Sequence, residues 1–450
     1  MNLSLFIVLL FGLQGIYWFA GRQASKKVQG QEDYCVAGKS VRFFPLMMTF
    51  LATQVGGGLV LGSADEAFRY GWSVLLYPLG AALGMICLGL GFGQRLAKLP
   101  VSTVAQILEI VYGSKMLRKI GSILSIVSLF MILAGQIIAS HKFLAAIGLK
   151  SPILFGLVWG IIFWYTAHGG LKAVIATDVV QAAVFSVVFL ACFGWMVWGY
   201  GTPIFSVSMQ SFAVGSSKLT GWLLMPLLYM IIEQDMGQRC FAGKSASVVS
   251  KAAIWAGILT MVVSVVPIAF GVLAKSANLE IASGASVLMS AIVFATNPWV
   301  SAIAGCAILA AIISTATSLI NAISSNLSQD FAVFREQKNL AVIRILTWML
   351  SIGALFVAFS FDNVVNMLIL SYELFVSCLL IPILFALFQK KGNFLSGLVS
   401  MLFGMVGFFF FKVVSVPLPS EMASILLSLV GYLCGEVYVR LQRKKVVSGV

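Results

Sequence analysis

Apolar runs of about 20 residues, separated by short polar segments, follow one another along the whole chain. A helix of that length crosses the hydrocarbon core of a bilayer, so each run predicts one membrane span. We predict an all-α polytopic membrane protein with about thirteen transmembrane helices, in a single domain over residues 1–450. The spans lie near residues 2–20, 43–61, 70–94, 119–146, 151–166, 174–200, 220–237, 250–274, 297–325, 342–360, 364–388, 393–411 and 420–439.

The segment PVSTVAQILEIVYGSK (100–115) lies between two of these spans and is too short and too mixed to be another. Pro100 and Thr103 stand at its start and Gly113 at its end, which is typical of helix starts and stops. It predicts an interfacial helix on the cytoplasmic side of the membrane.

Composition agrees with a membrane protein. Hydrophobic residues make up 60% of the chain and charged residues 10%, whereas soluble domains carry about 25% charged residues. The net charge of +14 does not indicate a nucleic-acid partner, because the basic residues form short clusters between the apolar runs. The seven cysteines have no C-x-x-C or metal-ligand spacing, so we expect neither disulfides nor a bound metal.

The distribution of Lys and Arg predicts how the spans are oriented. With the N-terminus outside, most of the 29 Lys and Arg residues fall on the inner side, as the positive-inside tendency requires. The first apolar run has no basic segment before it and no A-x-A cleavage site, so we predict a retained span. The prediction is a multi-pass protein of the plasma (inner or cell) membrane, N-terminus outside and C-terminus cytoplasmic.

Three consecutive glycines interrupt the second span, in the sequence LATQVGGGLVLG (51–62). Glycine costs roughly 1 kcal/mol relative to alanine inside a helix, and irregular backbone within a bilayer is tolerated only where it lines a cavity. The run, next to Thr53 and Gln54, therefore favours a helix broken at mid-depth with its carbonyls facing a cavity. The alternative is close helix packing, although packing usually spaces glycines four residues apart.

Hydroxyl groups gather in the ninth span, AILAAIISTATSLINAISS (307–325). Ser314, Thr315, Thr317 and Ser318 fall on one helical face, and the carbonyl of Ala311 lies one turn earlier. Hydroxyl and carbonyl oxygens are the ligands that a small hard cation prefers. The alternative is that these hydroxyls only bond back to carbonyls of their own helix.

Asp178 lies two or three turns into the span at 174–200, where the bilayer penalises charge. An acid at the centre of a span costs roughly 2.5–3.5 kcal/mol, so it usually faces a cavity or a partner. Asp178 would complete a cation path with the hydroxyls of 314–318, or lie near the membrane surface beside Lys172.

Two more acids end the run at 220–237, in the sequence YMIIEQDMGQRCFAGKS (229–245). Glu233 is the deeper of the two and is predicted to face the solute. Asp235 is predicted either to take part in the same site or to pair with Arg239 four residues later. In the fourth span, Gln136 would line the cavity or bond a neighbouring helix.

Sequence motifs do not indicate an enzyme. The chain contains no G-x-S-x-G, no Walker-type loop and no H-E-x-x-H. A membrane sensor is not expected either, because the segment after about residue 440 is too short for a signalling domain.

Five segments, taken in order, resemble the sodium:solute symporter family, which includes sodium-coupled sugar, proline, sialic acid, pantothenate and choline transporters. The resemblance covers roughly residues 30–390 and rests on DYCVAGKSV (33–41), FLATQVGGG (50–58), GGLKAVIATDVVQ (169–181), QRCFAGKS (238–245) and AAIISTATSLINAISS (310–325). It implies a leucine-transporter-type fold with broken helices and two inverted five-helix repeats, spans 2–6 and 7–11, over about 43–388. One span before this core (2–20) and two after it (393–439) would be extra.

The resemblance also implies a function and its ion sites. The protein would be a sodium-coupled secondary active symporter that imports a small organic solute by alternating access. Its main sodium site would consist of the carbonyls of Ala52, Val55 and Ala311 with the hydroxyls of Ser314 and Thr315. Some members have a second sodium position, whose equivalents here are Asp178, Ser314, Thr317 and Ser318. The sequence leaves open one or two ions and the oligomeric state; a monomer would suffice.

The solute is predicted to lie against the break in the second span. Sugar transporters resemble N-I-S-A-E-Q after the break, whereas this chain has QVGGGL (54–59), which argues against a sugar. ATQVGGG is most similar to the choline branch, A-T-W-V-G-G-G, with Gln54 at the position of the tryptophan. A carboxylate such as Glu233 would instead hold a cationic or zwitterionic solute. The predicted solute-binding residues are Gln54, Gly56, Gly57, Gly58, Gln136, Glu233 and Gln234.

Overall fold

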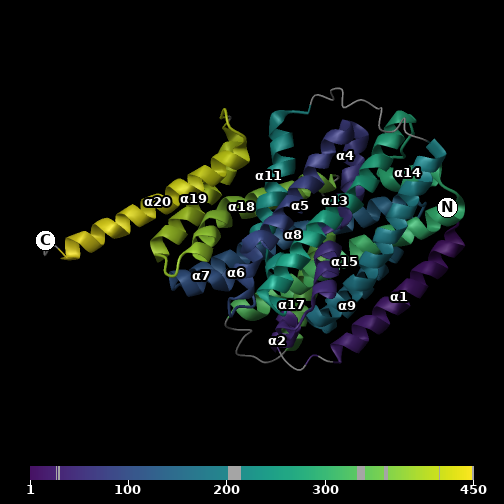
Figure 1. Cartoon of the computed structure of the whole chain (residues 1–450). Coiled ribbons are helices and arrows are strands. Elements are labelled where there is room, and N and C mark those ends of the chain that lie inside the picture. Colours follow the sequence, from purple (N-terminus) through teal and green to yellow (C-terminus); the bar gives the residue numbers. More distant parts are fainter. Residues whose placement is uncertain are drawn as a thin grey trace.

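A computed structural model describes residues 1–26, 28, 31–149, 151–200, 214–331, 340–358, 363–414 and 416–447. The chain is an all-helical bundle (Figure 1). Within the described residues, nine helices are long and apolar enough to cross a membrane. Three shorter apolar helices accompany them, at Phe43–Gln54, Ser216–Ile232 and Ile345–Ala358. The prediction of an all-α, multi-span membrane protein is confirmed.

The basic residues used to predict orientation are only partly described. Lys27, Lys150, Arg335 and Lys338 lie outside the described residues.

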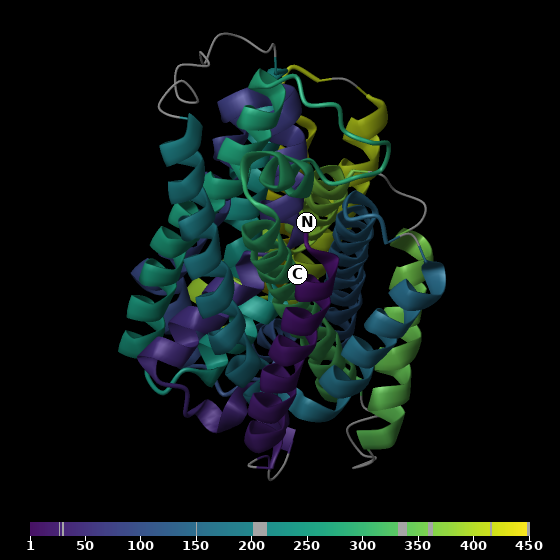
Figure 2. The same ribbon diagram turned by 90° about the vertical axis from the view of Figure 1, so that its right-hand side faces the viewer.

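The centre and the edge of the bundle differ in burial. Helix α15 (Pro298–Asp330) runs through the centre, and 94% of its most apolar stretch is buried inside the protein. Helix α1 (Leu3–Ser25) lies along one side of the bundle, packed on α9 (Pro152–Tyr200) and α15, and only 11% of its stretch is buried (Figures 1 and 2). The hydroxyl-rich segment of α15 is therefore held by neighbouring helices and not by lipid.

The predicted break in the second span is present. Helix α3 (Phe43–Gln54) ends at the glycine run, and Val55 there has ψ of 76°, which is not helical. After a wide π-helical turn at Gly58–Gly62 the chain continues as α4 (Ser63–Tyr70). The first helical hydrogen bonds after the break include the one that Val60 N donates to the Gly56 carbonyl, at 2.9 Å.

A second break falls where we predicted a continuous span at 220–237. Helix α11 (Ser216–Ile232) ends and α12 (Gln234–Ala242) begins at Glu233, whose ψ of 141° is extended. No glycine or proline marks this position, so the local sequence gives no sign of it. The two broken helices are joined by a short backbone bridge between Val41 and Gly243.

The other helices enclose these broken ones. Helix α9 joins the predicted spans 151–166 and 174–200, and its two halves meet at Gly170, whose φ is 62°. The predicted short helix is α7 (Val104–Tyr112), with the Thr103 hydroxyl accepting from Gln106 N and with Gly113 in the left-handed region. A helix that we did not predict, α14 (Val287–Ala295), precedes α15. The remaining helices are α2 (Gln31–Val36), α5 (Leu76–Cys87), α6 (Gly93–Ala97), α8 (Lys115–Ala146), α13 (Ala246–Ser276), α17 (Leu340–Ala358), α18 (Val364–Phe388), α19 (Phe394–Val413) and α20 (Ser420–Val447).

Candidate ion and solute site

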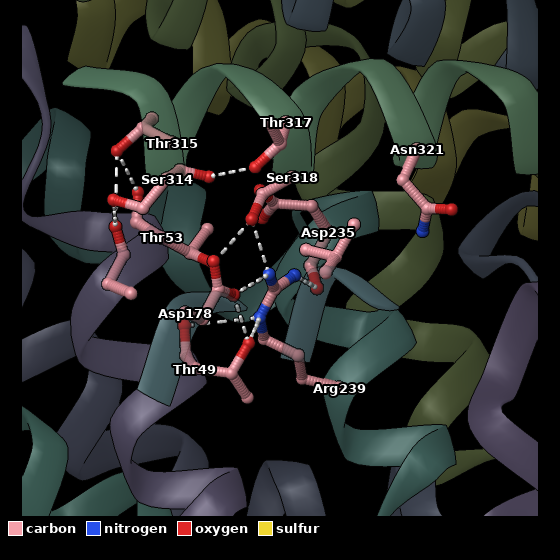
Figure 3. Close-up of polar contacts among 12 residues, drawn as sticks. Thr49, Thr53, Asp178, Asp235, Arg239, Ser314, Thr315, Thr317, Ser318 and Asn321 are labelled. Atoms are coloured by element: carbon pink, nitrogen blue, oxygen red, sulfur yellow. Dashed lines mark hydrogen bonds and ion pairs between the residues drawn. The ribbon is translucent and has the colours of Figure 1, made fainter. Parts of the chain in front are cut away.

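The hydroxyl-rich face of α15 lies against the end of α3. Ser314 Oγ donates a hydrogen bond to the carbonyl of Ala52 or of Ala311, each 2.9 Å away. Thr315 Oγ1 lies 2.9 Å from the Thr53 carbonyl, 3.2 Å from that of Ala52 and 3.3 Å from that of Ala311. We call these five oxygens the neutral cluster (Figure 3). It joins α3 to α15 through carbonyls that the broken helix leaves free.

The spacing of the neutral cluster suits a small cation. Oxygen ligands about 2.4 Å from a hard cation are separated from one another by roughly 3.4 Å. The hydroxyl and carbonyl oxygens here are already 2.9–3.3 Å apart, so only small shifts would be needed to place an ion among them. Four of the five predicted main-site residues, Ala52, Ala311, Ser314 and Thr315, meet here, and Val55 lies at the break itself.

A second, charged cluster lies beside the neutral one on α15 (Figure 3). Arg239 Nη2 lies 3.3 Å from Asp178 Oδ2 and donates to Ser318 Oγ at 2.6 Å. Thr49 Oγ1 donates to Asp178 Oδ2 at 2.5 Å and accepts from Arg239 Nε at 3.0 Å. Asp178 and Arg239 are both fully buried. We call Thr49, Asp178, Arg239 and Ser318 the charged cluster; it joins α3, α9, α12 and α15.

Of the two alternatives left open for Asp235, the ion pair with Arg239 is not found, and Asp235 lines the cavity instead. Arg239 Nη1 donates to the backbone carbonyl of Asp235 at 3.0 Å, but its carboxylate partner is Asp178 on another helix. Lys172 is not beside Asp178 either, since it pairs with Asp33 at 2.6 Å. The direct hydrogen bond between these two residues, four apart on α12, goes to the backbone carbonyl of Asp235.

A small cavity lies between the two breaks. Its volume is about 20 Å³, enough for about one water molecule. It is lined by Thr53, Gln54, Gly56, Gly58, Leu59, Tyr77, Ile132, Gln136, Met230, Glu233, Asp235, Thr315, Leu319, Leu368 and Tyr372. The predicted solute residues Gln54, Gly56, Gly58, Gln136 and Glu233 are therefore brought together. A solute larger than water requires the helices around this cavity to move apart.

Gly56 and Gly58 of the glycine run line this cavity, whereas Gly57, which was also predicted to face the solute, does not. Gly57 N donates to Gln136 Oε1 at 2.6 Å, so the fourth predicted span is tied to the break. A Cβ at Gly56 would collide with Thr315 Oγ1, one at Gly57 would lie 2.5 Å from Ala139 Cβ, and one at Gly58 2.5 Å from Leu368 Cδ2. Glycine is needed here because three neighbouring helices approach the backbone itself.

Two acids, Glu233 and Asp235, and two tyrosines, Tyr77 and Tyr372, also line the cavity. Glu233 and Asp235 are almost fully buried, and Glu233 Oε2 and both oxygens of Asp235 have no hydrogen-bond partner among the described residues. Tyr229 stacks on Tyr372 with ring centroids 4.3 Å apart, and Tyr77 and Tyr372 line the cavity. Buried carboxylates without partners favour a positively charged ligand, and aromatic faces attract cations.

Two predicted residues point away from these clusters. Gln234 Oε1 accepts a hydrogen bond from Val104 N at 2.7 Å, so this side chain fixes the start of α7 and does not line the cavity. Thr317 Oγ1 donates to the Ser314 carbonyl of its own helix at 2.9 Å. The alternative of back-bonding to the helix therefore holds for Thr317, whereas Ser314 and Thr315 also reach across to α3.

Several residues of the site were not predicted. Thr49, Tyr77 and Tyr229 stand singly in apolar runs, where nothing in the local pattern distinguishes them from core residues, and Tyr372 lies between Ser371 and Glu373. Thr53 Oγ1 lies 3.0 Å from Ser318 Oγ and so links the two clusters. The sequence feature that pointed to Thr53 as a site residue was its position directly before Gln54, at the glycine run.

Comparison with known proteins agrees with this architecture. The fold resembles that of a Na⁺-coupled sialic acid symporter in a substrate-bound outward-open state, with a TM-score of 0.78 at 17% identity, covering 96% of this chain and 98% of that one. It also resembles Mhp1, a nucleobase-cation-symport-1 family transporter, with a TM-score of 0.64 at 14% identity over 91% of this chain and 95% of that one. The structure therefore belongs to the leucine-transporter-type class of membrane transporter folds.

The sequence identifies the family. The model of the Sodium:solute symporter family matches residues 34–404, so the chain belongs to this family: it is a sodium-coupled solute symporter and not an enzyme. Among its relatives, a high-affinity choline transporter 1 of Drosophila melanogaster is 29% identical over 40% of this chain and 29% of its own length. A sodium/glucose cotransporter of Vibrio parahaemolyticus is 21% identical over 73% and 68%. A sodium/pantothenate symporter of Haemophilus influenzae is 29% identical over 41% and 40%.

Proposed function

We propose that this symporter binds its sodium ion in the neutral cluster and imports a cationic or zwitterionic organic solute through the cavity beside it. The observation that carries the proposal is the contact of Ser314 and Thr315 with the Ala52 carbonyl. An ion at this point binds both α3 and α15 and so favours the state in which the solute cavity is assembled. Sodium would therefore tighten solute binding, and the solute would tighten sodium binding by the same factor.

The proposed membrane arrangement has thirteen spans, with the N-terminus outside and the C-terminus cytoplasmic in the plasma (inner) membrane, and needs no second copy of the chain. Spans 2–6 and 7–11 would form the two inverted repeats. In support, each of these halves begins with a broken helix, α3 in the first and α11–α12 in the second.

The charge of the solute is inferred from the acids of the cavity. Glu233 and Asp235 have three buried carboxylate oxygens without partners in the described structure, while Arg239 is committed to Asp178. An ammonium group would neutralise these acids and would face Tyr77 and Tyr372. The choline transporter among the relatives carries a solute of this charge class, and Gln54 and Gln136 offer amides to a zwitterion's carboxylate.

A thermal-shift screen of the purified protein against amines, amino acids, vitamins and organic acids, each with sodium and with potassium, tests this proposal. We expect stabilisation by a cationic or zwitterionic compound in sodium only, followed by sodium-dependent uptake of that compound into proteoliposomes. Glu233→Gln removes the deepest charge and should weaken that response about 10-fold or more, whereas Gln234→Ala, the neighbour that faces α7, should not. A neutral sugar that stabilises the protein equally well in Glu233→Gln would contradict the proposed solute class.

A further inference from the structure

A second cavity lies between α1 and α9, apart from the small one that holds the predicted solute residues. Its volume is about 390 Å³, well over twice the roughly 150 Å³ of an apolar cavity that binds benzene in another protein. Residues of α9 and Thr317 of α15 form part of the lining. The residues of the α1 side share one helical face and are Tyr17, Trp18, Gly21, Arg22 and Ser25. Because α1 lies along one side of the bundle and is little buried (Figures 1 and 2), this cavity is at the boundary between protein and lipid.

The course of the two helices accounts for this cavity. Helix α9 has a kink at Gly170, whose φ is 62°, and its residues line the cavity on both sides of the kink, from Thr166 to Thr177. Helix α1 is helical throughout Leu3–Ser25, and an unbroken helix cannot follow a kinked one along its whole length. The space therefore follows from the two backbones, so a ligand can occupy it without unfolding either helix.

The buried hydroxyl of Tyr17 is a free hydrogen-bond donor at this cavity. Tyr17 is 3% exposed, and its hydroxyl has no hydrogen-bond partner among the described residues. The hydroxyls of Thr166 and Thr177 differ, since they donate to carbonyls of their own helix at 2.7 and 2.9 Å. A buried hydroxyl without a partner costs free energy, which a ligand with an acceptor oxygen would recover.

Arg22 gives the cavity a positive charge. Its guanidinium lies over the ring of Trp18, 4.9 Å from the ring centroid, and none of the described residues that line the cavity is acidic. A guanidinium together with a free hydroxyl donor favours an anion with several acceptor oxygens. Basic pockets between transmembrane helices are suited to phospholipid headgroups. We propose that this cavity binds one anionic phospholipid of the surrounding membrane.

Tyr17 and Arg22 are spaced like the polar layers of such a lipid. They are five residues apart, which is about 7.5 Å along a helix, and the headgroup layer on each side of a bilayer is roughly 5–8 Å thick. A phosphate at Arg22 would therefore place its ester carbonyls near the Tyr17 hydroxyl, with an acyl chain in the rest of the cavity. The leaflet follows from the proposed membrane arrangement, in which Arg22 lies on the cytoplasmic side, where anionic lipids are found.

Native mass spectrometry of the delipidated, full-length protein tests this inference. Phosphatidylglycerol should bind as one molecule per chain, and phosphatidylcholine with the same acyl chains should bind about 5-fold more weakly, because it carries no net charge. The melting temperature should rise with phosphatidylglycerol but not with inorganic phosphate, which has no chain to fill the cavity. Equal binding of the two lipids, or equal stabilisation by inorganic phosphate, would overturn the assignment to an anionic lipid.

Two variants remove the proposed contacts with the lipid. Arg22→Gln should weaken phosphatidylglycerol binding about 5-fold, and Tyr17→Phe, which keeps the shape of the side chain, about 3-fold. Lys26→Gln is the matched control, because it removes an equal charge at the same end of α1 but Lys26 does not line the cavity. If Lys26→Gln weakens binding as much as Arg22→Gln, the lipid is attracted to the basic end of α1 in general and the cavity is not its site.

A third variant fills the cavity and leaves every charge in place. A Cβ at Gly21 would lie 3.5 Å from Thr177 Cγ2, which is ordinary contact, so Gly21→Leu adds its bulk between α1 and α9. It should abolish the binding of one phosphatidylglycerol per chain. Unchanged binding in folded Gly21→Leu would mean that the lipid lies elsewhere.

The sodium-dependent thermal shift of the wild-type protein separates the lipid site from the proposed function. Neither Ser314 nor Thr315 lines this cavity. Wild type that shows no sodium response but binds phosphatidylglycerol as expected would overturn the proposed function and support the lipid site. Wild type that responds to sodium but does not bind phosphatidylglycerol would overturn the lipid site alone.

Discussion

The neutral and charged clusters share one face of α15 but join their helices by different means. The neutral cluster uses uncharged hydroxyls and carbonyls from α3 and α15, each of which gains only about 1 kcal/mol from a hydrogen bond. The charged cluster uses a fully buried ion pair between α9 and α12, whose disruption typically costs about 3–5 kcal/mol. Weak, adjustable contacts suit a cation that must enter and leave in every cycle, and a buried ion pair suits a permanent link.

Asp178→Asn should have the largest effect, because it leaves Arg239 buried without a carboxylate partner. We expect a loss of about 3–5 kcal/mol of stability, measured by thermal unfolding of the purified protein. The double variant with Arg239→Gln carries no unpaired charge and should be more stable than Asp178→Asn alone. If both are equally unstable, the ion pair is not the permanent link that the comparison requires.

Ser314→Ala combined with Thr315→Ala should abolish sodium dependence without a comparable loss of stability. The change removes both hydroxyls of the neutral cluster, and we expect sodium affinity to fall about 100-fold, equal to about 2.7 kcal/mol. Sodium-dependent thermal stabilisation measures this loss. Ser324→Ala is the control, since Ser324 lies on the same helix but bonds Ile320 and Thr347. Full sodium-dependent uptake in the double variant would show that sodium does not bind in the neutral cluster.

Gly56→Ala should have an intermediate effect on the neutral cluster. The added methyl group would collide with Thr315 Oγ1 and lie 2.8 Å from Gln136 Oε1, so the hydroxyl must turn away from the Ala52 carbonyl. We expect sodium to bind about 10-fold more weakly, equal to about 1.4 kcal/mol, in a ²²Na⁺ titration. Gly15→Ala on α1, where nothing lies within 4 Å, should bind sodium as wild type does.

Thr317→Val should have the smallest effect. The hydroxyl donates only to the Ser314 carbonyl, and valine keeps the shape of the side chain, so stability should change by less than about 0.5 kcal/mol. The sodium titration should match that of wild type. A clear loss of sodium binding would show that Thr317 is an ion ligand. The distinction between the two clusters would then be smaller than the structure indicates.

Features that depend on local pattern could be predicted from the sequence. The length of the apolar runs gave an all-helical membrane protein, and the three glycines gave the break after α3. The helical spacing of hydroxyls placed Ser314 and Thr315 on one face, which α3 indeed covers.

Features that depend on contacts between residues far apart in the sequence could not be predicted. Asp178 and Arg239 are 61 residues apart in the chain, and only the packing of α9 against its neighbours reveals their contact. The i, i+4 spacing rule suggested Asp235 as a partner of Arg239, because this rule considers only side chains on the same helix. The break at Glu233 has no local signal of this kind, since no glycine or proline stands at that position.

The three glycines at the break also bear on how the transporter could be inhibited. Gly56, Gly57 and Gly58 each approach a different helix, namely α15, α8 and α18, so a shift of any of these helices would change its contact with the break. A small rigid compound bound beside the glycines, once the helices have moved apart to admit it, would hinder their return. Such an inhibitor would need to match the shape of the backbone at the glycines and would not need to resemble the solute.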